Sequence, residues 1–279
     1  MITLDHEHAL IAAVRDTARR LIMPRFRHLD SGSVATKSRA DDLVTIADQE
    51  TEAALTQIIP NILPDALIVG EEATEADPDL PWRIDTAPQA VILDPVDGTW
   101  NFASGLANFG VILAVTQDGL PVFGLLYDPV FEDWVLARKG GGAWFCRDGM
   151  APMRLQIDGE TPEGSPGFAP FPLFSPGVQP RLVESLMALG RLENLRCSCH
   201  EYRQLARGHG RFVLTHSPKP WDHAAGSLIC QEAGGVSKRL NGAAYRPGLK
   251  AGPLVSARNS EIFAMVQARL GWLTHEAEI

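Results

Sequence analysis

The chain has 279 residues, 45% of them hydrophobic, which is enough to bury the core of one large domain or of two closely joined subdomains. Its formal net charge of −9 argues against non-specific binding to nucleic acid or to an anionic membrane surface, because both would repel it. The charge does not exclude a phosphorylated small molecule, provided that metal cations neutralise the site locally.

The four cysteines predict free thiols and neither a disulfide framework nor a zinc site. Cys197 and Cys199 are too close in sequence for either, and no Cys-x-x-Cys pair occurs. The first residues carry acids where a signal peptide would carry bases, and no apolar run approaches the roughly 20 residues of a membrane span. We therefore expect reduced cysteines and a cytoplasmic protein.

The first half of the chain alternates helix-like and strand-like patterns. Apolar residues at helical spacing predict an opening helix over residues 4–20, and a second helix is predicted from Thr45 to Ile59, just before Pro60. Short apolar runs predict strands at 66–69, 90–93, 110–116, 122–127, 134–137 and 143–145. Asp118-Gly119 between two of these runs is typical of a hairpin turn.

The second half begins with residues 165–180, whose dense proline, glycine and phenylalanine predict a long surface connection. Beyond it, the pattern predicts helices at 179–190, 200–208 and 224–233, and strands at 195–198, 212–215 and 236–238. This alternation favours an α/β layer. We predict an N-terminal α+β subdomain over residues 1–155 and a C-terminal α/β subdomain over residues 156–279, joined in a single compact unit.

The most informative segment is Asp-Pro-Val-Asp-Gly-Thr at residues 94–99, directly after an apolar run. A strand would deliver Asp94 to its C-terminal end, and a turn at the proline would bring Asp97 back to the same point. The two carboxylates and the carbonyl of Val96 could then converge on a hard cation, which prefers oxygen ligands.

The two residues after Asp97 suggest a phosphate seat beside that cation. A helix starting at Thr99 would point its free N–H groups at the same spot, and Gly98 would let another group approach the backbone closely. The competing interpretation is an ordinary Asp-Pro turn with an aspartate N-cap. The other acidic motifs of the chain argue against it.

Three further segments supply acidic residues. Glu71 lies in a Gly-Glu-Glu motif at the end of another short apolar run. Asp222 lies in Trp-Asp-His-Ala-Ala-Gly, where an N-cap belongs, and the small residues after it would let a helix pack closely. Asp48 opens the second predicted helix, with Lys37 and Asp42 upstream.

Other interpretations of the motifs are weaker. His223 has no second His or Cys at metal spacing, so we interpret it as a packing or substrate-rim residue. Ser198, His200 and Glu201 lie too close in sequence to converge as a catalytic triad, and no Gly-x-Ser-x-Gly elbow occurs. The chain carries no Walker or dinucleotide-binding glycine pattern.

Together these residues resemble the inositol monophosphatase family, a branch of the lithium-sensitive, metal-dependent sugar-phosphatase superfamily. The resemblance is carried by Asp-Pro-Val-Asp-Gly-Thr-Trp-Asn-Phe at 94–102, Trp-Asp-His-Ala-Ala-Gly at 221–226 and Gly-Glu-Glu at 70–72, and it covers essentially the whole chain. It implies the layered αβαβα sugar-phosphatase fold, of the α+β class, with the site at the junction of the two halves.

The resemblance also implies metal ligands, most of them in the N-terminal subdomain. A first metal would be bound by Glu71, Asp94 and the Val96 carbonyl, and a second by Asp94, Asp97 and Asp222, with Asp94 bridging. An all-oxygen ligand set points to magnesium, two or three ions per site, with manganese as a plausible substitute.

Catalytic and substrate-binding roles follow from the same resemblance. Thr99 with Asp48 would polarise the attacking water, and Glu71 would help to activate it. Gly98 and Thr99 would hold the phosphate through backbone N–H groups. Lys37 and Asp42 match positions near the mouth of the site.

The expected activity is magnesium-dependent hydrolysis of a small phosphomonoester by metal-activated water, with an inositol-1-phosphate-like substrate as the first choice. Histidinol-phosphate phosphatase, 3′(2′),5′-bisphosphate nucleotidase and fructose-bisphosphatase share the machinery and remain alternatives. A non-catalytic regulator that binds metal or a phosphorylated ligand is a further alternative. The resemblance also leads us to expect a homodimer and inhibition by lithium.

The substrate pocket departs from the family pattern. The position of Thr215 usually carries an acidic residue that contacts inositol hydroxyls, and small residues usually stand where this chain has Cys199-His200-Glu201. Glu201, Thr215 and Asp222 are the expected substrate-binding residues here, and Glu201 followed by Arg203 would change which hydroxyls or amines are accepted. We therefore expect catalysis to be retained and the leaving group to differ from plain inositol.

Overall fold

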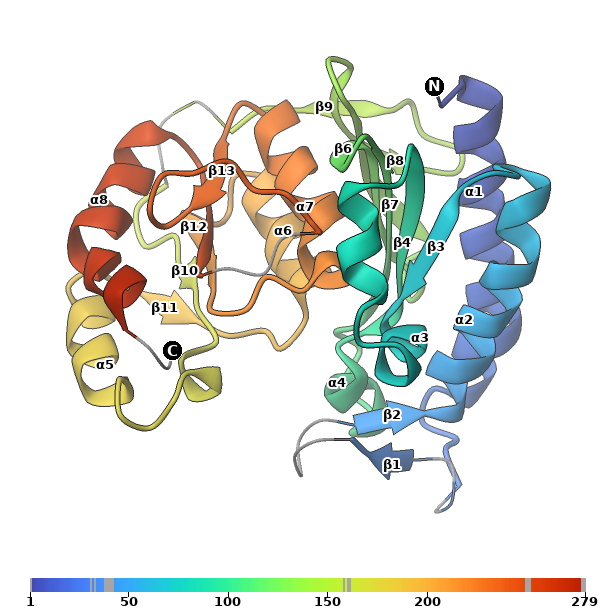
Figure 1. The fold of residues 1–279 in the computed structure, drawn as a ribbon, viewed down its shortest axis with the longest axis horizontal. Coiled ribbons are helices and arrows are strands. Elements are labelled where there is room, and N and C mark those ends of the chain that lie inside the picture. The colour runs from blue at the N-terminus through green and yellow to red at the C-terminus, as the bar shows by residue number, and fades with distance from the viewer. Residues whose placement is uncertain are drawn as a thin grey trace.

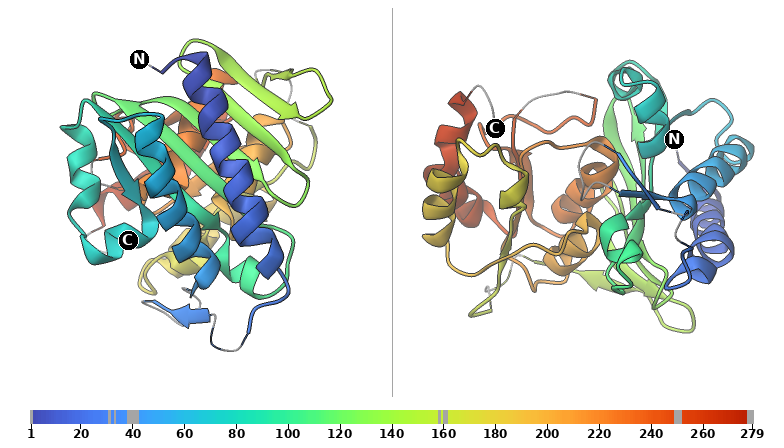
Figure 2. Two further views of the ribbon diagram at one scale, coloured as in Figure 1. Left: turned by 90° about the vertical axis from the view of Figure 1, so that its right-hand side faces the viewer. Right: turned by 90° about the horizontal axis from the view of Figure 1, so that it is seen from below.

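The computed structural model describes residues 2–30, 32, 34–37, 43–157, 159, 162–248 and 252–276. Its elements stack in five layers that alternate between helices and sheets (Figures 1 and 2). The predicted α+β class and the αβαβα arrangement are confirmed. None of the helices in these ranges is long and apolar enough to cross a membrane.

The larger sheet has seven strands in the order β3-β4-β5-β6-β7-β8-β9, and only β3 and β4 are parallel to each other. The strands are β3 (Leu67–Gly70), β4 (Gln89–Asp97), β5 (Gly110–Gln117), β6 (Leu120–Asp128), β7 (Asp133–Arg138), β8 (Gly142–Arg147) and β9 (Met153–Leu155). All six strands predicted in this half are present, and β9 is an addition. The Asp118-Gly119 turn has the positive φ angles, 50° and 73°, that a tight hairpin requires.

Two long helices cover one face of this sheet. They are α1 (Leu4–Thr17), continued by π and 3₁₀ turns to Arg25, and α2 (Ile46–Ile58), continued by a 3₁₀ turn to Asn61. Thr45 is the N-cap of α2, one residue before the helix. Val91 and Leu93 of β4 pack in the core on this side, whereas Ile92 faces the opposite core. Both faces are buried, which explains why the strand is a continuous apolar run.

The central layer consists of α6 (Ser198–Ala206) and α7 (Pro220–Glu232), which lie between the two sheets (Figure 1). Glycines bring these elements close together, as the small residues after Asp222 predict. A Cβ at Gly124 of β6 would lie 2.9 Å from the Cα of Ala225, and one at Gly226 would lie 2.2 Å from the Tyr202 ring. Side chains larger than hydrogen cannot fit at either position.

The second sheet has five strands in the order β11-β10-β12-β14-β13, and α5 (Gln179–Met187) and α8 (Ser260–Leu270) cover its outer face. The strands are β10 (Gly167–Phe168), β11 (Leu192–Glu193), β12 (Phe212–Thr215), β13 (Val236–Arg239) and β14 (Leu254–Ala257). The surface connection predicted at 165–180 is wrong in part, because β10 pairs in the middle of this sheet. The division at residue 155 stays a prediction.

Three short elements complete the described chain and border the site. A two-stranded sheet joins β1 (Val34–Thr36) to β2 (Leu43–Thr45), and short helices follow β3 and β4, namely α3 (Glu71–Ala76) and α4 (Thr99–Ala103). The strand predicted at 195–198 is wrong, because Cys197 is the N-cap of α6. The N-terminus of this helix binds the Asp97 carboxylate through the N–H groups of Ser198 and Cys199, a contact between distant residues that the local sequence does not reveal.

Candidate metal centre

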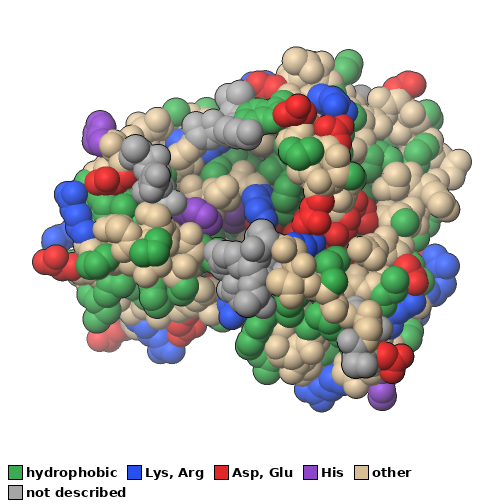
Figure 3. Space-filling model, turned by 60° about the horizontal axis from the view of Figure 1, so that its bottom comes forward, with side chains coloured by type: hydrophobic (Ala, Val, Ile, Leu, Met, Phe, Trp, Pro, Cys, Tyr) green, Lys and Arg blue, Asp and Glu red, His purple; other side chains and the backbone are tan. Residues whose placement is uncertain are grey.

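A cavity of about 410 Å³ opens between the two halves of the molecule. Figure 3 shows a hollow with acidic side chains gathered on one wall and lysine, arginine and histidine side chains opposite. The lining includes the predicted site residues Glu71, Asp97, Gly98, Thr99, Glu201, Thr215 and Asp222. Asp94 lies behind this surface and is 1% exposed.

Asp94 and Asp97 both belong to β4, which corrects the predicted strand end at Asp94. Asp94 pairs with Ile112 and Asp97 with Gly110, so β4 has one more residue than β5 between these two pairs. Side chains three residues apart in a regular strand point to opposite faces, and the extra residue of this β-bulge lets both carboxylates face the same side.

The N-terminus of α6 holds the Asp97 carboxylate. The backbone N–H of Ser198 donates to Oδ1 over 3.2 Å, and the N–H of Cys199 donates to Oδ2. The thiol of Cys197 lies 3.1 Å from Oδ2. These donors, together with the positive end of the helix dipole, stabilise a carboxylate there. The contact joins a ligand candidate of the first sheet to the second half of the chain.

Asp222 completes the cluster from the first turn of α7. The N-cap of this helix is Lys219, so the interpretation of Asp222 as an N-cap is wrong. Ligand oxygens of Asp94, Asp97 and Asp222 all lie within 4.8 Å of one another. Oδ1 of Asp94 is buried and has no hydrogen-bond partner. A cluster of three carboxylates, one of which has a buried oxygen without a hydrogen-bond partner, fits a hard divalent cation.

The pKa values of the three carboxyl groups show that burial and neighbouring charges disfavour their ionised forms. Burial, reinforced by the charge of Glu71, raises the pKa of Asp94 well above its usual range. Burial raises the pKa of Asp97 to about 6, although the N–H of Cys199 opposes this change. Burial also raises the pKa of Asp222 to about 7, and Lys219 opposes it. Without a cation, protons would compensate part of the repulsion.

Glu71 lies at the cavity wall, at the first position of α3. Its Oε1 lies 3.2 Å from Nζ of Lys37, and Oε1 of Glu72 lies 2.6 Å from the same nitrogen. Burial lowers the pKa of Lys37, but Glu71 and Glu72 outweigh burial and raise it overall, so the ammonium is retained. Lys37 therefore places a cation directly beside Glu71, and its position at the mouth of the site stays a prediction. Asp42 lies outside the described residues.

Asp48 and Thr99 are brought together, as the resemblance requires. The Thr99 hydroxyl lies 3.1 Å from Oδ1 of Asp48 and 3.0 Å from the Val96 carbonyl. Oδ2 of Asp48 accepts hydrogen bonds from the backbone N–H and the hydroxyl of Thr45. Burial raises the pKa of Asp48 to about 6.

Gly98 turns the chain from β4 into α4. Its φ is +87°, a left-handed conformation that favours glycine, and a Cβ there would lie 3.0 Å from the carbonyl oxygen of Asn108. Asn101, in the first turns of α4, donates to the carbonyls of Asn108 and Leu195 over 2.8 and 2.9 Å. These contacts fasten the Gly98 turn to the segment that precedes α6.

A model of the inositol monophosphatase family matches residues 5–270. The chain belongs to the inositol monophosphatase family. This confirms the family that the sequence motifs indicate and the extent of the resemblance, which covers almost the whole chain.

Two relatives and one solved structure illustrate the position of the chain within the inositol monophosphatase family. The Nus factor SuhB of Pasteurella multocida is 31% identical over 254 residues, which are 86% of each chain. The Inositol-1-monophosphatase of Bacillus subtilis is 29% identical over 221 residues, 76% of this chain and 78% of the relative. An IMPase/NADP phosphatase complexed with Mg²⁺ and phosphate shares the fold, with a TM-score of 0.75, 20% identity and 96% coverage of both chains.

Glu201 and Thr215, two of the positions at which the chain departs from the pattern that the resemblance implies, line the cavity. Oε1 of Glu201 accepts a 2.9 Å hydrogen bond from the N–H of Leu195, and burial raises the pKa of Glu201 to about 8. The Thr215 hydroxyl lies 3.4 Å from the carbonyl of Ser217. One oxygen of Glu201 is thus already hydrogen-bonded within the protein. Thr215 presents a neutral hydroxyl at the position where the resemblance predicts an acidic residue.

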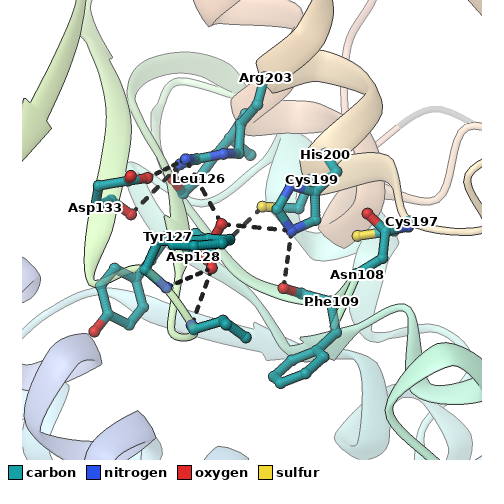
Figure 4. A network of polar contacts seen from close by, with 12 residues as sticks. Asn108, Phe109, Leu126, Tyr127, Asp128, Asp133, Cys197, Cys199, His200 and Arg203 are labelled. Carbon is teal, nitrogen blue, oxygen red and sulfur yellow. Dashed lines mark hydrogen bonds and ion pairs between the residues drawn. The ribbon is translucent and has the colours of Figure 1, made fainter. Parts of the chain in front are cut away.

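Arg203 and His200 point away from the cavity, which corrects the expectation that Arg203 shapes the pocket. The Arg203 guanidinium donates to the Asp133 carboxylate and, over 2.9 Å, to the carbonyl of Leu126 (Figure 4). Nε2 of His200 lies 3.0 Å from the Phe109 carbonyl and 3.9 Å from the Asp128 carboxylate. This buried polar network anchors α6, the helix whose N-terminus holds Asp97.

Glu52 is a functional residue that the sequence analysis missed. Its carboxylate, 5% exposed, accepts hydrogen bonds from the N–H groups of Glu72 and Ala73 over 2.9 and 2.7 Å. It therefore stabilises the N-terminus of α3, on which Glu71 lies. The glycine of the Gly-Glu-Glu motif is the sequence feature that could have indicated this close contact, because a Cβ at Gly70 would lie 2.2 Å from Cδ of Glu52.

Proposed function

We propose that this chain is a magnesium-dependent phosphatase of small phosphomonoesters. The observation that carries the proposal is the cluster of Asp94, Asp97 and Asp222, whose oxygens lie within 4.8 Å of one another around a buried oxygen without a partner. Asp94, Asp97 and Asp222 would hold one ion, and Glu71 with the Val96 carbonyl would complete a second site beside Asp94. Bound divalent cations would neutralise the phosphate charge, lower the pKa of a water molecule and stabilise the leaving alkoxide.

The protein supplies the proton acceptor for the attacking water. The Thr99 hydroxyl can direct its own proton to Asp48 or to the Val96 carbonyl, which leaves a lone pair free to accept from water in the cavity. Asp48 is held in place by Thr45, so a proton passed through Thr99 would reach a fixed carboxylate. Glu71, on the same cavity wall, would help to orient the water. Gly98 and Thr99 would hold the phosphate through their backbone N–H groups.

The substrate is expected to be a small phosphorylated metabolite, and an inositol-1-phosphate-like ester is the first choice. Histidinol phosphate and a 3′(2′),5′-nucleoside bisphosphate are the alternatives, because Thr215 lacks the charge expected for binding inositol hydroxyls. Four free cysteines fit a reducing, cytoplasmic compartment. A homodimer, manganese as a substitute and inhibition by lithium remain predictions from the family.

The test is phosphate release from inositol, histidinol, nucleotide and sugar phosphates, with magnesium and with chelator. Asp94→Asn should abolish turnover, because it removes the charge shared by both sites. Asp118→Asn is the matched control, since Asp118 is exposed in a hairpin turn at φ +50°, which asparagine also adopts. The control should retain full activity, and an active Asp94→Asn variant would refute the metal-centred mechanism.

Regulation without turnover is the second candidate function, favoured by the 31% identity to a relative named Nus factor SuhB. The same substrate panel separates the two proposals. Magnesium-dependent turnover that Asp94→Asn abolishes supports the phosphatase. A folded protein that binds magnesium, measured by calorimetry, and releases phosphate from no ester would support the regulator.

A further inference from the structure

The imidazole of His223 lies in the wall of the catalytic cavity, one residue after Asp222. His223 is only 4% exposed, and its ring makes an edge-on contact with Tyr202, with 5.8 Å between ring centroids and an interplanar angle of 67°. The sequence around this residue is compatible with a packing role and with a substrate-rim role. Its position at the cavity, beside a proposed metal ligand, favours the rim.

A chain of buried hydroxyl groups orients this ring from behind. The Tyr202 hydroxyl lies 3.3 Å from Nδ1 of His223, and the Ser256 hydroxyl donates to the Tyr202 oxygen over 3.3 Å. The hydroxyls of Ser237 and Ser256 are 2.7 Å apart. Tyr202, Ser237 and Ser256 are each at most 1% exposed, so water does not compete for these contacts.

The direction of this hydroxyl network favours one tautomer of the imidazole. Because the Tyr202 oxygen accepts from Ser256, its own proton is available for Nδ1 of His223. A neutral ring that accepts at Nδ1 carries its hydrogen on Nε2. Among the described residues, the only hydrogen-bond partner of His223 is the Tyr202 hydroxyl at Nδ1. The ring therefore has an N–H donor left for a ligand in the cavity.

We propose that His223 is a specificity-determining residue whose Nε2–H donates a hydrogen bond to the leaving group of the substrate. This inference rests on the proposed function and narrows its substrate class. The favoured esters carry a hydroxyl, carbonyl or carboxylate oxygen on the leaving group. An ammonium group has no acceptor to offer and would also meet Lys219 on the same cavity wall. Esters without such an acceptor forgo this hydrogen bond and are disfavoured by about its net value.

The inference is tested with a pair of esters and a pair of variants. Inositol 1-phosphate offers hydroxyl acceptors on its leaving group, whereas phenyl phosphate offers none beyond the ester oxygen. His223→Leu removes the donor, and His223→Gln keeps an N–H donor at a similar distance. His223→Leu should lower kcat/KM for inositol 1-phosphate by about three- to tenfold, the value of one neutral hydrogen bond, and leave that for phenyl phosphate nearly unchanged. His223→Gln should restore most of the loss.

Tyr202→Phe is a third variant, because it keeps the aromatic ring and removes only the hydroxyl that orients His223. It should shift the ratio of the two kcat/KM values in the same direction as His223→Leu. Equal losses on both esters, or no difference between His223→Leu and His223→Gln, would overturn the inference and leave the phosphatase in place. Failure of the wild-type protein to hydrolyse any ester would overturn the proposed function and this inference together.

Discussion

The carboxylate of Glu52 accepts a 2.9 Å hydrogen bond from the backbone N–H of Glu72, so a side chain of α2 stabilises the first turn of α3. The adjacent N–H of Ala73 donates to the other carboxylate oxygen. Glu71, the first residue of α3, is therefore positioned by a group that never faces the cavity. Gly70 is required because any larger residue would occupy the place of the Glu52 carboxylate.

We expect Glu52→Gln to weaken both stability and magnesium binding. Glutamine has one acceptor oxygen and no charge, so it can cap only one of the two N–H groups, at a cost of about 1–2 kcal/mol. Urea unfolding and a magnesium titration measure the two effects. Glu50→Gln is the matched control on the same helix, because Glu50 only pairs with Arg25 at the surface. Equal effects of the two substitutions would contradict the role of Glu52.

Gly98→Ala should destabilise the protein by more than its backbone strain alone. An alanine in the left-handed conformation costs about 1–2 kcal/mol, and its Cβ would also meet the Asn108 carbonyl at 3.0 Å. Gly149→Ala separates the backbone strain from the steric contact. Gly149 also has a positive φ, +76°, but nothing lies within 4 Å of its Cβ position. The free energy of unfolding should fall further for Gly98→Ala. If both variants lose the same amount, the close approach has no cost.

The layered fold could be predicted largely because its elements carry strong local patterns. The six strands β3 to β8 are apolar runs bounded by turn residues, and the helix 46–58 follows a threonine cap. The short strands β10 and β11 could not be predicted. Each is two residues long; β10 pairs with the distant strand β12, and among the described strands β11 pairs only with β10. A segment of two residues is too short to show the alternation of apolar and polar residues that identifies a strand.

The residues of the proposed site could be predicted from the sequence, but much of their geometry could not. The acidic motifs identified Asp94, Asp97 and Asp222, and the structure brings their oxygens together. The bulge in β4 was missed, because a strand that continues through a proline and an unpaired residue has no local sequence signature. The support of Asp97 by α6 was also missed, since it joins residues about a hundred positions apart.

Without metal, the protein should lose stability as the pH rises from about 4 to about 7. The folded-state pKa values of Asp97 and Asp222 are raised to about 6 and about 7, above those of the unfolded chain. The folded state therefore keeps protons that the unfolded state releases, so deprotonation favours unfolding in this range. Magnesium should remove the repulsion, and its stabilising effect on Tm should grow with pH.

Asp222→Asn isolates this contribution from the other titrating groups. In chelator, the variant should melt at a higher temperature than the wild-type protein at pH 7.5 and at a similar temperature at pH 4, where the carboxyl group is protonated. In saturating magnesium the order should reverse, because the variant lacks a ligand. A constant difference in Tm across the pH range would contradict the raised pKa of the Asp222 carboxyl group.

Arg203→Met should be strongly destabilising, because it leaves the buried Asp133 carboxylate without its partner (Figure 4). Removing one member of a buried ion pair typically costs about 3–5 kcal/mol. Arg20→Met is the comparison, since Arg20 forms an exposed pair with Asp16 whose loss should cost at most about 1 kcal/mol. Denaturant unfolding measures both. A cost near that of Arg20→Met would mean that water or another cation compensates Asp133.

Thr99→Val should lower kcat and leave magnesium affinity nearly unchanged. Valine keeps the shape of threonine and removes the hydroxyl that lies between Asp48 and the Val96 carbonyl, so the proton path from the attacking water is lost. General-base catalysis is typically worth about 100-fold or more, and kcat should fall by that order. Thr99→Ser keeps the hydroxyl and should remain active. If valine and serine support the same kcat with the same magnesium affinity, the Thr99–Asp48 pair does not accept the proton of the water.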